Sequence, residues 1–362
     1  MDKTILNLLK KIEKNGYNAY IVGGYVRNYL LGLNCRDIDI CTNALPKDII
    51  NIFKLKKDTK DNYGSVNIKT KKYNFDITTY RSESNYINHK PNNIEYINDL
   101  KKDLLRRDFT INSILINSKE EFIDLFDGIN DLNNKLIKCV GDTYNKLKED
   151  PLRILRAIRF SIVYNLELDK EIIKFIKVNK DLIKSISYYR KKEELDKIFS
   201  SNNKLEGLNK LKELKLLSVL EINYDEVIYT KDINGIYAQI EYSNNYPMNK
   251  ETKKIINNIR EIIQLKEINN YTLYKYDLYI NSIAGEILGI DYKEINKMYE
   301  SLPIKSRKDI KINIKSIVKI NNNCYNNVNE LYRKLENNIL SGKLKNRVND
   351  IVKFIRKWGL YE

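Results

Sequence analysis

An apolar strand, a glycine pair and an alternating acidic stretch follow one another near the N-terminus, and this order constrains the fold more than any other feature of the sequence. The run "AYIV" (19–22) is typical of a short buried strand, and Gly23 and Gly24 follow it directly. The next residues, "YVRNYLLG" (25–32), predict a short helix closed by a glycine. In "DIDIC" (37–41) acidic and apolar residues alternate, so the two kinds of side chain face opposite sides of a strand. A strand, turn, helix and second strand are therefore expected here.

The residues around this unit complete a domain of the α+β class. Apolar residues at helical spacing predict a helix over 4–14, and a proline opens a second predicted helix over 46–54. Two alternating runs, 65–70 and 73–81, are joined by a pair of lysines and predict a hairpin. We therefore expect a small mixed or antiparallel sheet in this part of the chain.

Beyond this domain the pattern is helical. It turns helical over 100–116, and no strand pattern is recognisable after about residue 145. Breaks near residues 140, 222 and 302 predict a division into four parts. These are a head over 1–140, a helical neck over 141–222, a helical body over 223–302 and a helical tail over 303–362.

The charge of the chain points to its partner. A formal charge of +16 favours a polyanionic partner such as nucleic acid. The lysines alone do not decide this, because Lys, Asn, Ile and Tyr are all abundant, as an A/T-rich coding bias would also produce. The arginines are more informative: only 14 of the 64 basic residues are Arg, and eight of these precede residue 160. Since arginine binds phosphate and carboxylate through two parallel hydrogen bonds, this clustering indicates where a site lies.

Composition also excludes several classes of protein. His89 is the only histidine, so mechanisms that need several imidazole groups are excluded. Cys35, Cys41, Cys139 and Cys324 show no CxxC spacing and predict neither a zinc site nor disulfides; we expect reduced, mostly buried thiols. No apolar run approaches the roughly 18 residues of a membrane span, and the N-terminus does not resemble a signal peptide. We expect a globular cytoplasmic protein with no membrane partner.

The acidic strand is a candidate metal site. Asp37 and Asp39 share one face of the predicted strand, close enough to bind divalent cations together. Oxygen ligands without His or Cys favour Mg²⁺. Asp76, in "FDIT", could bring a third carboxylate to the same face of the sheet. Taken alone, each of these acids also fits an ordinary solvated strand.

The glycine pair is a candidate anion site. A strand, a Gly-Gly turn and a helix N-terminus present backbone N–H groups to an anion, and Arg27 can add a charged clamp to the same phosphates. Gly23 and Gly24 also fit a tight turn that needs a positive φ and binds nothing.

A second unusual stretch is "EDPLRILRAIRF" (149–160). Asp150 followed by proline predicts a helix start, so Arg153, Arg156 and Arg159 lie along one helical stripe. Three like charges in a row repel one another unless something anionic neutralises them. A solvated basic face is the alternative interpretation.

Together these stretches resemble a known family. "GGYVRNYLLG" followed by "RDIDICTNALP", then "RRDFTINSI", "EDPLRILRAIRF" and "YYRKKEELDKIF", occur in the order and at the separations of the class II tRNA nucleotidyltransferases. This family comprises the bacterial CCA-adding enzymes and their poly(A) polymerase relatives, within the DNA polymerase beta superfamily. The resemblance covers residues 1–220. It implies a polymerase-beta-like head followed by helical neck, body and tail, with Mg²⁺ as cofactor, CTP and ATP as substrates and tRNA as partner.

The resemblance also assigns roles to individual residues. Asp37 and Asp39 would hold magnesium, and Asp76, from its place in the strand pattern, is a candidate third catalytic carboxylate beside them. The residues that would bind the nucleotide are Gly23, Gly24, Arg27, Arg107, Asp108, Asn112, Glu149, Asp150, Arg153, Arg156 and Arg159.

In the family the E-D-x-x-R element is a protein template for the incoming base, matched here by Glu149, Asp150 and Arg153. Cytosine and adenine each present an amino donor beside a ring-nitrogen acceptor, whereas uracil and guanine reverse that order. A carboxylate that accepts beside a guanidinium that donates fits C and A, and it leaves unpaired polar groups against U or G. Arg156 and Arg159 would then face the triphosphate.

Two features differ from the family pattern or refine it. Asn28 stands where the family usually has Asp, which removes a charge and keeps hydrogen bonding, so we expect altered tuning of Arg27. Residues 82–98 form a loop of full length, which favours complete CCA addition over CC addition, and we expect His89 in this loop to be solvent-exposed.

The sequence leaves several functions open. The leading interpretation is addition of CCA to the 3′ end of tRNA, with the acceptor and TΨC arms bound by lysines around 305–319 and 343–357. A poly(A) polymerase or an enzyme that adds only the terminal A would share the head motifs. A non-catalytic RNA-binding protein would keep the basic tail, although it would not need both Asp37 and Asp39.

Overall fold

The computed structural model of the chain describes residues 1–55, 64–87, 89–313, 316–317 and 328–358. It contains two compact units, residues 1–222 and residues 223–362. The finer division into four parts remains a prediction.

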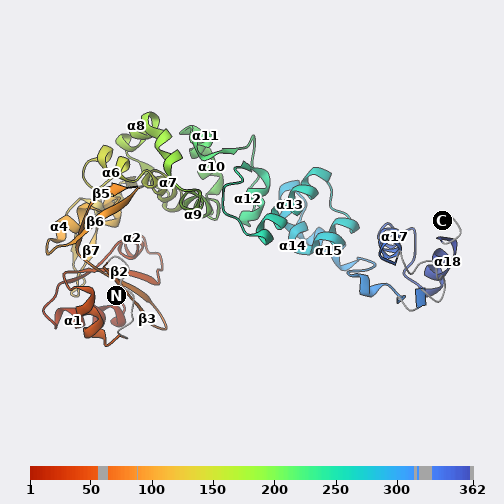
Figure 1. Cartoon of the computed structure of the whole chain (residues 1–362), viewed down its shortest axis with the longest axis horizontal. Coiled ribbons are helices and arrows are strands. Elements are labelled where there is room, and N and C mark those ends of the chain that lie inside the picture. Colours follow the sequence, from red (N-terminus) through yellow and green to blue (C-terminus); the bar gives the residue numbers. More distant parts are fainter. Residues whose placement is uncertain (56–63, 88, 314–315, 318–327, 359–362) are drawn as a thin grey trace. The chain divides into compact units, whose positions relative to one another are not determined.

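The first unit opens with the predicted alternation of helices and strands (Figure 1). Its elements up to residue 96 are α1 (Lys3–Glu13), β1 (Ala19–Val22), α2 (Gly24–Leu30), β2 (Asp37–Thr42), α3 (Pro46–Phe53), β3 (Ser65–Lys69), β4 (Asn74–Thr79), β5 (Arg81–Ile87) and β6 (Lys90–Tyr96).

Six strands form one mixed sheet in the order β3-β4-β2-β1-β7-β8, which confirms the expected α+β head. The last two are β7 (Leu115–Ile116) and β8 (Phe122–Ile123). Strand β2 pairs antiparallel with β1 and parallel with β4, so Asp39 lies between Val22 and Asp76. Strands β3 and β4 form the predicted antiparallel hairpin.

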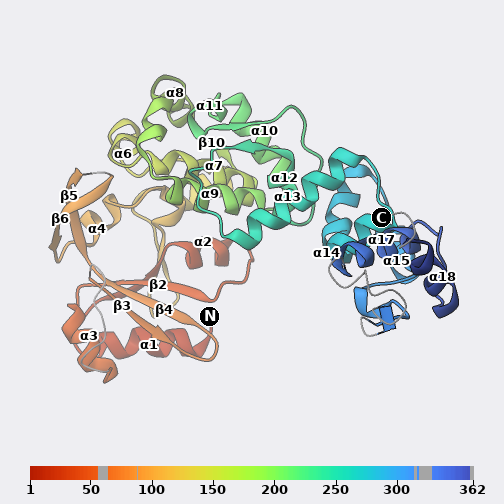
Figure 2. The ribbon, with the colours of Figure 1, turned by 45° about the vertical axis from the view of Figure 1, so that its right-hand side comes forward.

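The alternation in β2 separates a buried face of the sheet from an acidic one. Ile38 and Ile40 are 1% exposed and belong to a core that α1 and α3 complete from one side (Figure 2). On the other face Cys41 packs with Val22 and Leu104, but this cluster covers only one end of β2. Asp37 and Asp39 are therefore left open at the other end of the strand.

The prediction of a helical run over 100–116 is wrong beyond its first turns. Helix α4 ends at Leu105 (Leu100–Leu105), and after a 3₁₀ turn, η1 (Thr110–Asn112), the chain enters strand β7. Ile111, Ile114 and Leu115 are fully buried at spacings of three and four residues, which also fit a helix, and strand pairing with β1 decides the outcome.

The loop expected over 82–98 is a hairpin. Strands β5 and β6 pair antiparallel along their whole length, and their mainly polar residues gave no alternating signal. His89, expected to be exposed, is half-buried near the turn with φ of 62°, and its Nε2 lies 2.7 Å from the Ser185 hydroxyl.

Helices dominate the rest of the first unit, as predicted. The elements are α5 (Gly128–Asn133), β9 (Leu136–Ile137), α6 (Thr143–Glu149), α7 (Leu152–Tyr164), β10 (Glu167–Leu168), α8 (Lys170–Asn179), η2 (Lys180–Ser185), α9 (Tyr188–Phe199), α10 (Lys204–Glu213), α11 (Leu217–Leu220) and β11 (Ile222–Asn223). Helix α7 packs against α9 and α10, and Phe160 on α7 meets Phe109 edge to face at 5.7 Å between ring centroids. These contacts fix α7 beside the segment that follows α4.

The second unit is also helical. Its elements are α12 (Ile233–Gln239), β12 (Glu241–Tyr242), α13 (Lys250–Leu265), α14 (Asn270–Leu288), α15 (Tyr292–Glu300), η3 (Arg307–Asp309), α17 (Val328–Leu340) and α18 (Val348–Trp358). Helix α14 contacts α13, α15 and α17 and forms the centre of this unit. It is kinked at Asp277, whose φ is 66°.

The described cysteines are unpaired thiols. Cys41 and Cys139 are buried and Cys35 is half-buried, whereas Cys324 lies outside the described residues. Within the described parts of the chain, no helix combines the length and apolar character that a membrane crossing requires.

Truncating the sheet core should destabilise the first unit. Ile21 in β1 is completely buried, so Ile21→Ala should lower the free energy of unfolding by about 2–5 kcal/mol through lost burial and a residual cavity. Val178 on α8 is 77% exposed, so Val178→Ala should change the free energy of unfolding by no more than about 0.5 kcal/mol. Urea unfolding followed by circular dichroism measures both, and equal losses would contradict the assigned core.

Candidate active site

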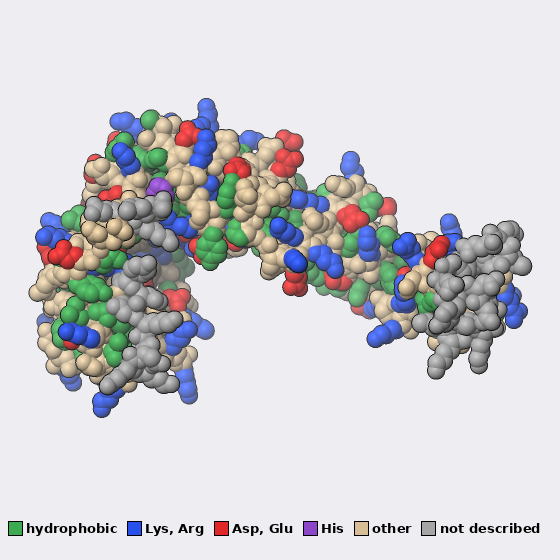
Figure 3. Space-filling view, in the orientation of Figure 1, with side chains coloured by type: hydrophobic (Ala, Val, Ile, Leu, Met, Phe, Trp, Pro, Cys, Tyr) green, Lys and Arg blue, Asp and Glu red, His purple; other side chains and the backbone are tan. Residues whose placement is uncertain are grey.

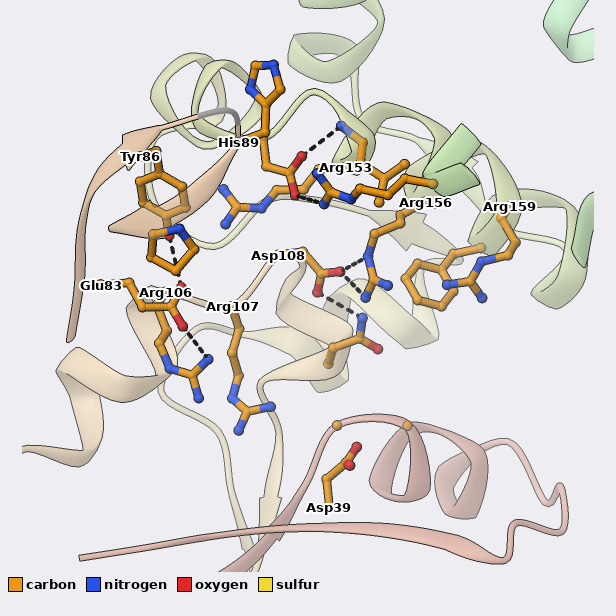
Figure 4. A pocket seen from close by; sticks show the side chains of 18 of the residues that line it. Asp39, Glu83, Tyr86, His89, Arg106, Arg107, Asp108, Arg153, Arg156 and Arg159 are labelled. Atoms are coloured by element: carbon orange, nitrogen blue, oxygen red, sulfur yellow. Dashed lines mark hydrogen bonds and ion pairs between the residues drawn. The ribbon is translucent and has the colours of Figure 1, made fainter. Parts of the chain in front are cut away.

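The candidate site is a cleft of about 930 Å³ in the first unit. Residues from β2, the β5–β6 hairpin, the segment after α4, and helices α7 and α9 line it (Figure 4). Nine of the lining side chains are Arg or Lys and five are Asp or Glu. A cleft with this excess of positive charge favours an anionic ligand.

Three carboxylates lie on the acidic face of the sheet. Asp37 accepts a hydrogen bond from Asn74 at 2.8 Å. Asp39 is open to the cleft, yet the surrounding atoms shield it enough from water to raise its pKa. Asp76 lies beside Asp39 in the parallel pair of strands, where it accepts a hydrogen bond from Ser65. Partial burial, and then the charge of Asp39, raise the pKa of Asp76.

Asp37 and Asp39 fit a magnesium ion. Both offer oxygen ligands only, and a bound cation would offset the shielding that raises the pKa of Asp39. In the described residues, no group of three or more His, Cys, Asp or Glu side chains is arranged to hold a metal. Two carboxylates leave the other coordination positions to substrate oxygens and water, which is how Mg²⁺ usually binds in nucleotide sites.

Gly23 allows the turn before α2 to approach Asp39. Its φ is 75°, and a β-carbon built on it would lie 2.8 Å from Oδ2 of Asp39. The backbone N–H of Gly24 hydrogen bonds to the same carboxylate. The turn therefore positions the Asp39 carboxylate. Phosphate binding by the backbone N–H of Gly24 remains a prediction.

Arg27 is a buried cation held by uncharged oxygen atoms. Its side chain donates to Asn28 at 3.0 and 3.3 Å, to Asn112 at 2.5 Å and to the Tyr164 hydroxyl at 2.6 Å. The residue is only 5% exposed, and burial lowers its pKa. Asn28, the departure noted in the sequence, thus contacts Arg27 directly without neutralising it.

The RRD motif lies at the centre of the cleft. Asp108 accepts hydrogen bonds from Arg156 at 2.8 Å and from Asn112 at 3.0 Å. Burial alone would raise the pKa of Asp108, but the charge of Arg156 and the bond from Asn112 outweigh it and hold this pKa well below its ordinary value. Arg107 extends toward Asp39 in Figure 4. Its Nε has no partner among the described residues, and its only ion pair is with Asp103 at 3.6 Å.

Each arginine of the α7 stripe is paired with a carboxylate of the protein. Arg153 pairs with Glu149 at 3.0 Å, Arg156 with Asp108 at 2.6 Å, and Arg159 with Glu194 at 2.5 Å. The repulsion expected along this stripe is therefore already neutralised within the protein. It does not by itself require a bound anion.

The two template residues are oriented by their neighbours. Asp150 lies two residues before the start of α7, and it accepts from Arg190 at 2.7 Å and from the Leu152 backbone N–H at 3.2 Å. Arg153 donates through Nη1 to Glu149 and to the Lys146 carbonyl oxygen at 2.6 Å. Its Nε and Nη2 groups have no hydrogen bond to another described residue.

The hairpin is tied to the same cleft through Glu83. This carboxylate accepts from Arg81 at 2.8 Å, from Arg106 at 3.2 Å and from the Tyr86 hydroxyl at 3.0 Å. The Tyr86 ring lies 6.0 Å from the Arg153 guanidinium. The hairpin therefore reaches the template region.

The structure brings most of the predicted site residues together. Of those expected, only Asp76 and Glu149 do not line the cleft. No sequence pattern predicted a role for Glu83, Tyr86 or Tyr164 at this site. Tyr164 follows Arg156 and Phe160 at spacings of four residues, and this helical repeat of arginine and aromatic residues was an available signal.

Comparisons with known proteins agree with this arrangement. Residues 19–138 match the poly A polymerase head domain, and residues 165–224 match the "probable RNA and SrmB-binding site of polymerase A". The CCA-adding enzyme of Staphylococcus aureus strain MRSA252 is 30% identical over 98% of both chains.

Solved structures share the fold. A Bacillus stearothermophilus CCA-adding enzyme in complex with CTP superposes with a TM-score of 0.83 at 22% identity, over 99% of this chain and 98% of that one. A Thermotoga maritima CCA-adding enzyme complexed with tRNA_CCA gives 0.73 at 21% identity, over 99% and 96%.

The fold and the arginine-lined cleft beside an acidic sheet face define a nucleotidyltransferase head joined to a helical RNA-binding region. The chain belongs to the class II family of CCA-adding enzymes and poly(A) polymerases.

The Asp108–Arg156 pair should stabilise the fold in a pH-dependent way. Because the folded-state pKa of Asp108 is lowered, its contribution is present above the ordinary aspartate pKa of about 4 and is lost as the pH falls below it. Asp108→Asn should cost about 1–3 kcal/mol at pH 7, and the difference from wild type should shrink toward pH 2. Urea unfolding at several pH values measures this, and a difference independent of pH would contradict the pairing.

Proposed function

We propose that this chain completes the 3′-CCA end of tRNA from CTP and ATP, in the cytoplasm. The observation that carries the proposal is one cleft lined by Asp37 and Asp39 on the sheet and by Asp150 and Arg153 at the start of α7. The first pair supplies chemistry common to nucleotidyl transfer, and the second supplies a choice between bases. The whole-length similarity to CCA-adding enzymes supports the same reaction.

Asp37 and Asp39 would hold magnesium. When bound there, Mg²⁺ would lower the pKa of the RNA 3′-hydroxyl and neutralise charge on the triphosphate during attack on the α-phosphorus. Asp39 has to be ionised to bind a cation. Gly23 keeps the backbone close without displacing the carboxylate.

The triphosphate would bind where positive charge is available. Nε of Arg107 has no hydrogen-bond partner among the described residues, and the hydrogen bonds of Arg27 to Asn112 and Tyr164 leave its charge uncompensated because both acceptors are neutral. Arg156 and Arg159 are paired with carboxylates, so we assign them mainly to holding Asp108 and Glu194 in place. This assignment differs from the direct triphosphate contacts expected from the sequence.

Base selection would use Asp150 as acceptor and Arg153 as donor. Arg190 and Glu149 fix their orientations, which lowers the entropy lost when a base binds. Arg153 keeps Nε and Nη2 for the base edge. Cytosine and adenine satisfy both groups, and uracil and guanine would leave both unpaired.

The basic surface of the second unit would bind tRNA by charge and shape. Lys and Arg side chains are spread over both units (Figure 3). One groove in the second unit is lined by Asp350, by Leu344 and Phe354, and by six basic side chains: Lys343, Lys345, Arg347, Lys353, Arg356 and Lys357. Of the other predicted stretch, 305–319, residues 314–315 and 318–319 lie outside the described residues.

Incorporation into defined tRNA ends tests the function. Purified protein with Mg²⁺ should add CMP to tRNA that lacks the whole CCA end or its last two residues, and a single AMP to tRNA that lacks only the terminal A. Asp39→Asn should reduce incorporation at least about a thousandfold, the equivalent of several kcal/mol, and leave tRNA binding nearly unchanged. Asp181→Asn, at a side chain 69% exposed, is the matched control.

Long A tracts would identify a poly(A) polymerase, and addition of A alone would exclude CCA addition.

A pair of glycine substitutions separates backbone strain from displacement of Asp39. Gly23 and Gly32 both have positive φ, at 75° and 70°, but a β-carbon at Gly32 would meet no atom within 4 Å. Gly32→Ala should lose about 1 kcal/mol of stability, and Gly23→Ala should lose more, because a φ of 75° with a ψ of −139° is a conformation that other residues rarely adopt. Only Gly23→Ala should lose CMP and AMP incorporation, by about a hundredfold or more, because its methyl group displaces the carboxylate. Similar activities in the two variants would contradict this role of Gly23.

A further inference from the structure

Tyr164, the last residue of α7, contacts the most buried cation of the cleft. Its hydroxyl accepts a hydrogen bond from Nη2 of Arg27 at 2.6 Å, and its ring centroid lies 4.2 Å from the Arg27 guanidinium carbon. Phe160, one turn earlier on α7, lies 4.9 Å from the same carbon and stacks on Tyr164 at 6.0 Å. Aromatic faces near a desolvated guanidinium stabilise it without taking up its donors.

The charge of Arg27 is kept unpaired by this arrangement. All three of its hydrogen-bonding partners, Asn28, Asn112 and Tyr164, present neutral oxygen atoms. Within the described residues Arg27 has no ion pair, in contrast to Arg153, Arg156 and Arg159. Neutral ligands hold a guanidinium in one orientation and leave its charge for an anion.

A chain of hydrogen bonds connects Arg27 to α7 by a second route. Arg27 donates to Asn112, Asn112 donates to Asp108, and Asp108 accepts from Arg156. Arg156 and Tyr164 are eight residues apart on α7, a little over two turns, so they are separated along the helix and by about 80° around it. Helix α7 thus meets the Arg27 region at two points, one charged and one neutral.

The same helix begins beside the template residues Asp150 and Arg153. A displacement of α7 along or about its axis would therefore move the base-selecting end and the Arg27 contact together. Asn28 and Asn112 belong to the head and would not follow such a movement. Tyr164 is the direct hydrogen-bonding link from α7 to Arg27.

We propose that Tyr164 is a positioning residue that orients Arg27 for the triphosphate and couples the phosphate site to the base-selecting helix. This inference rests on the proposed function in assigning Arg27 to a nucleoside triphosphate. It predicts that Tyr164 affects CTP and ATP equally, because the triphosphate is common to both.

Tyr164→Phe tests this role, since it retains the ring and removes only the oxygen that Arg27 contacts. The dissociation constants of CTP and ATP, measured by titration calorimetry with Mg²⁺ and without tRNA, should both rise about three- to tenfold. The ratio between the two nucleotides should stay unchanged. Tyr164→Leu, which also removes the ring, should give a larger rise. Tyr292→Phe, at an exposed tyrosine on α15, is the control and should change neither constant.

A double-mutant cycle with Arg27→Lys distinguishes positioning from a general structural effect. In the Arg27→Lys background Tyr164→Phe should change the dissociation constants less than about 1.5-fold. An equal rise in both backgrounds, or no rise in the otherwise wild-type protein, would overturn the inference. Failure of the proposed function gives a different result: a wild-type protein that binds both triphosphates but does not make CCA would still show the coupling between Tyr164 and Arg27.

Discussion

The ion pair between Arg156 and Asp108 is the interaction on which the cleft depends. It joins α7 to the segment after α4, and Asn112 extends the connection to Arg27. Removal of either charge would leave its partner unpaired in a shielded site, which costs more than the pair contributes. The acidic sheet face and the template residues keep their relative positions because this link is in place.

The arginines of the cleft are of two kinds: some are paired with carboxylates of the protein, and others are not neutralised. Arg156 and Arg159 on α7 are neutralised by Asp108 and Glu194, so they act as rigid supports for other side chains. Arg27 has neutral ligands, and in the part of the chain that the structure describes Nε of Arg107 has no hydrogen-bond partner. A site built in this way is preorganised, because its supporting side chains need not rearrange when a charged ligand binds. Asn28 fits this division, since an aspartate in its place would pair with Arg27.

The sequence predicted the elements with strong local patterns. Strand β2 followed from the alternation of acidic and apolar residues, helix α7 followed from the Asp-Pro helix start, and nearly all predicted site residues line one cleft. It failed where tertiary pairing outweighed local preference, at strand β7 and the β5–β6 hairpin. It also could not show which carboxylate each arginine would meet, because Asp108 and Glu194 lie 48 and 35 residues from their partners.

The contact between Gly23 and Asp39 has a consequence for how such a chain can change over time. Oδ2 of Asp39 occupies space that a β-carbon at position 23 would need, so the acid fits only if that position has no side chain. Any replacement of Gly23 requires a simultaneous accommodation in strand β2, sixteen residues away. The side chain at position 23 and the placement of the Asp39 carboxylate are therefore not independent of each other, although sixteen residues separate them in the chain.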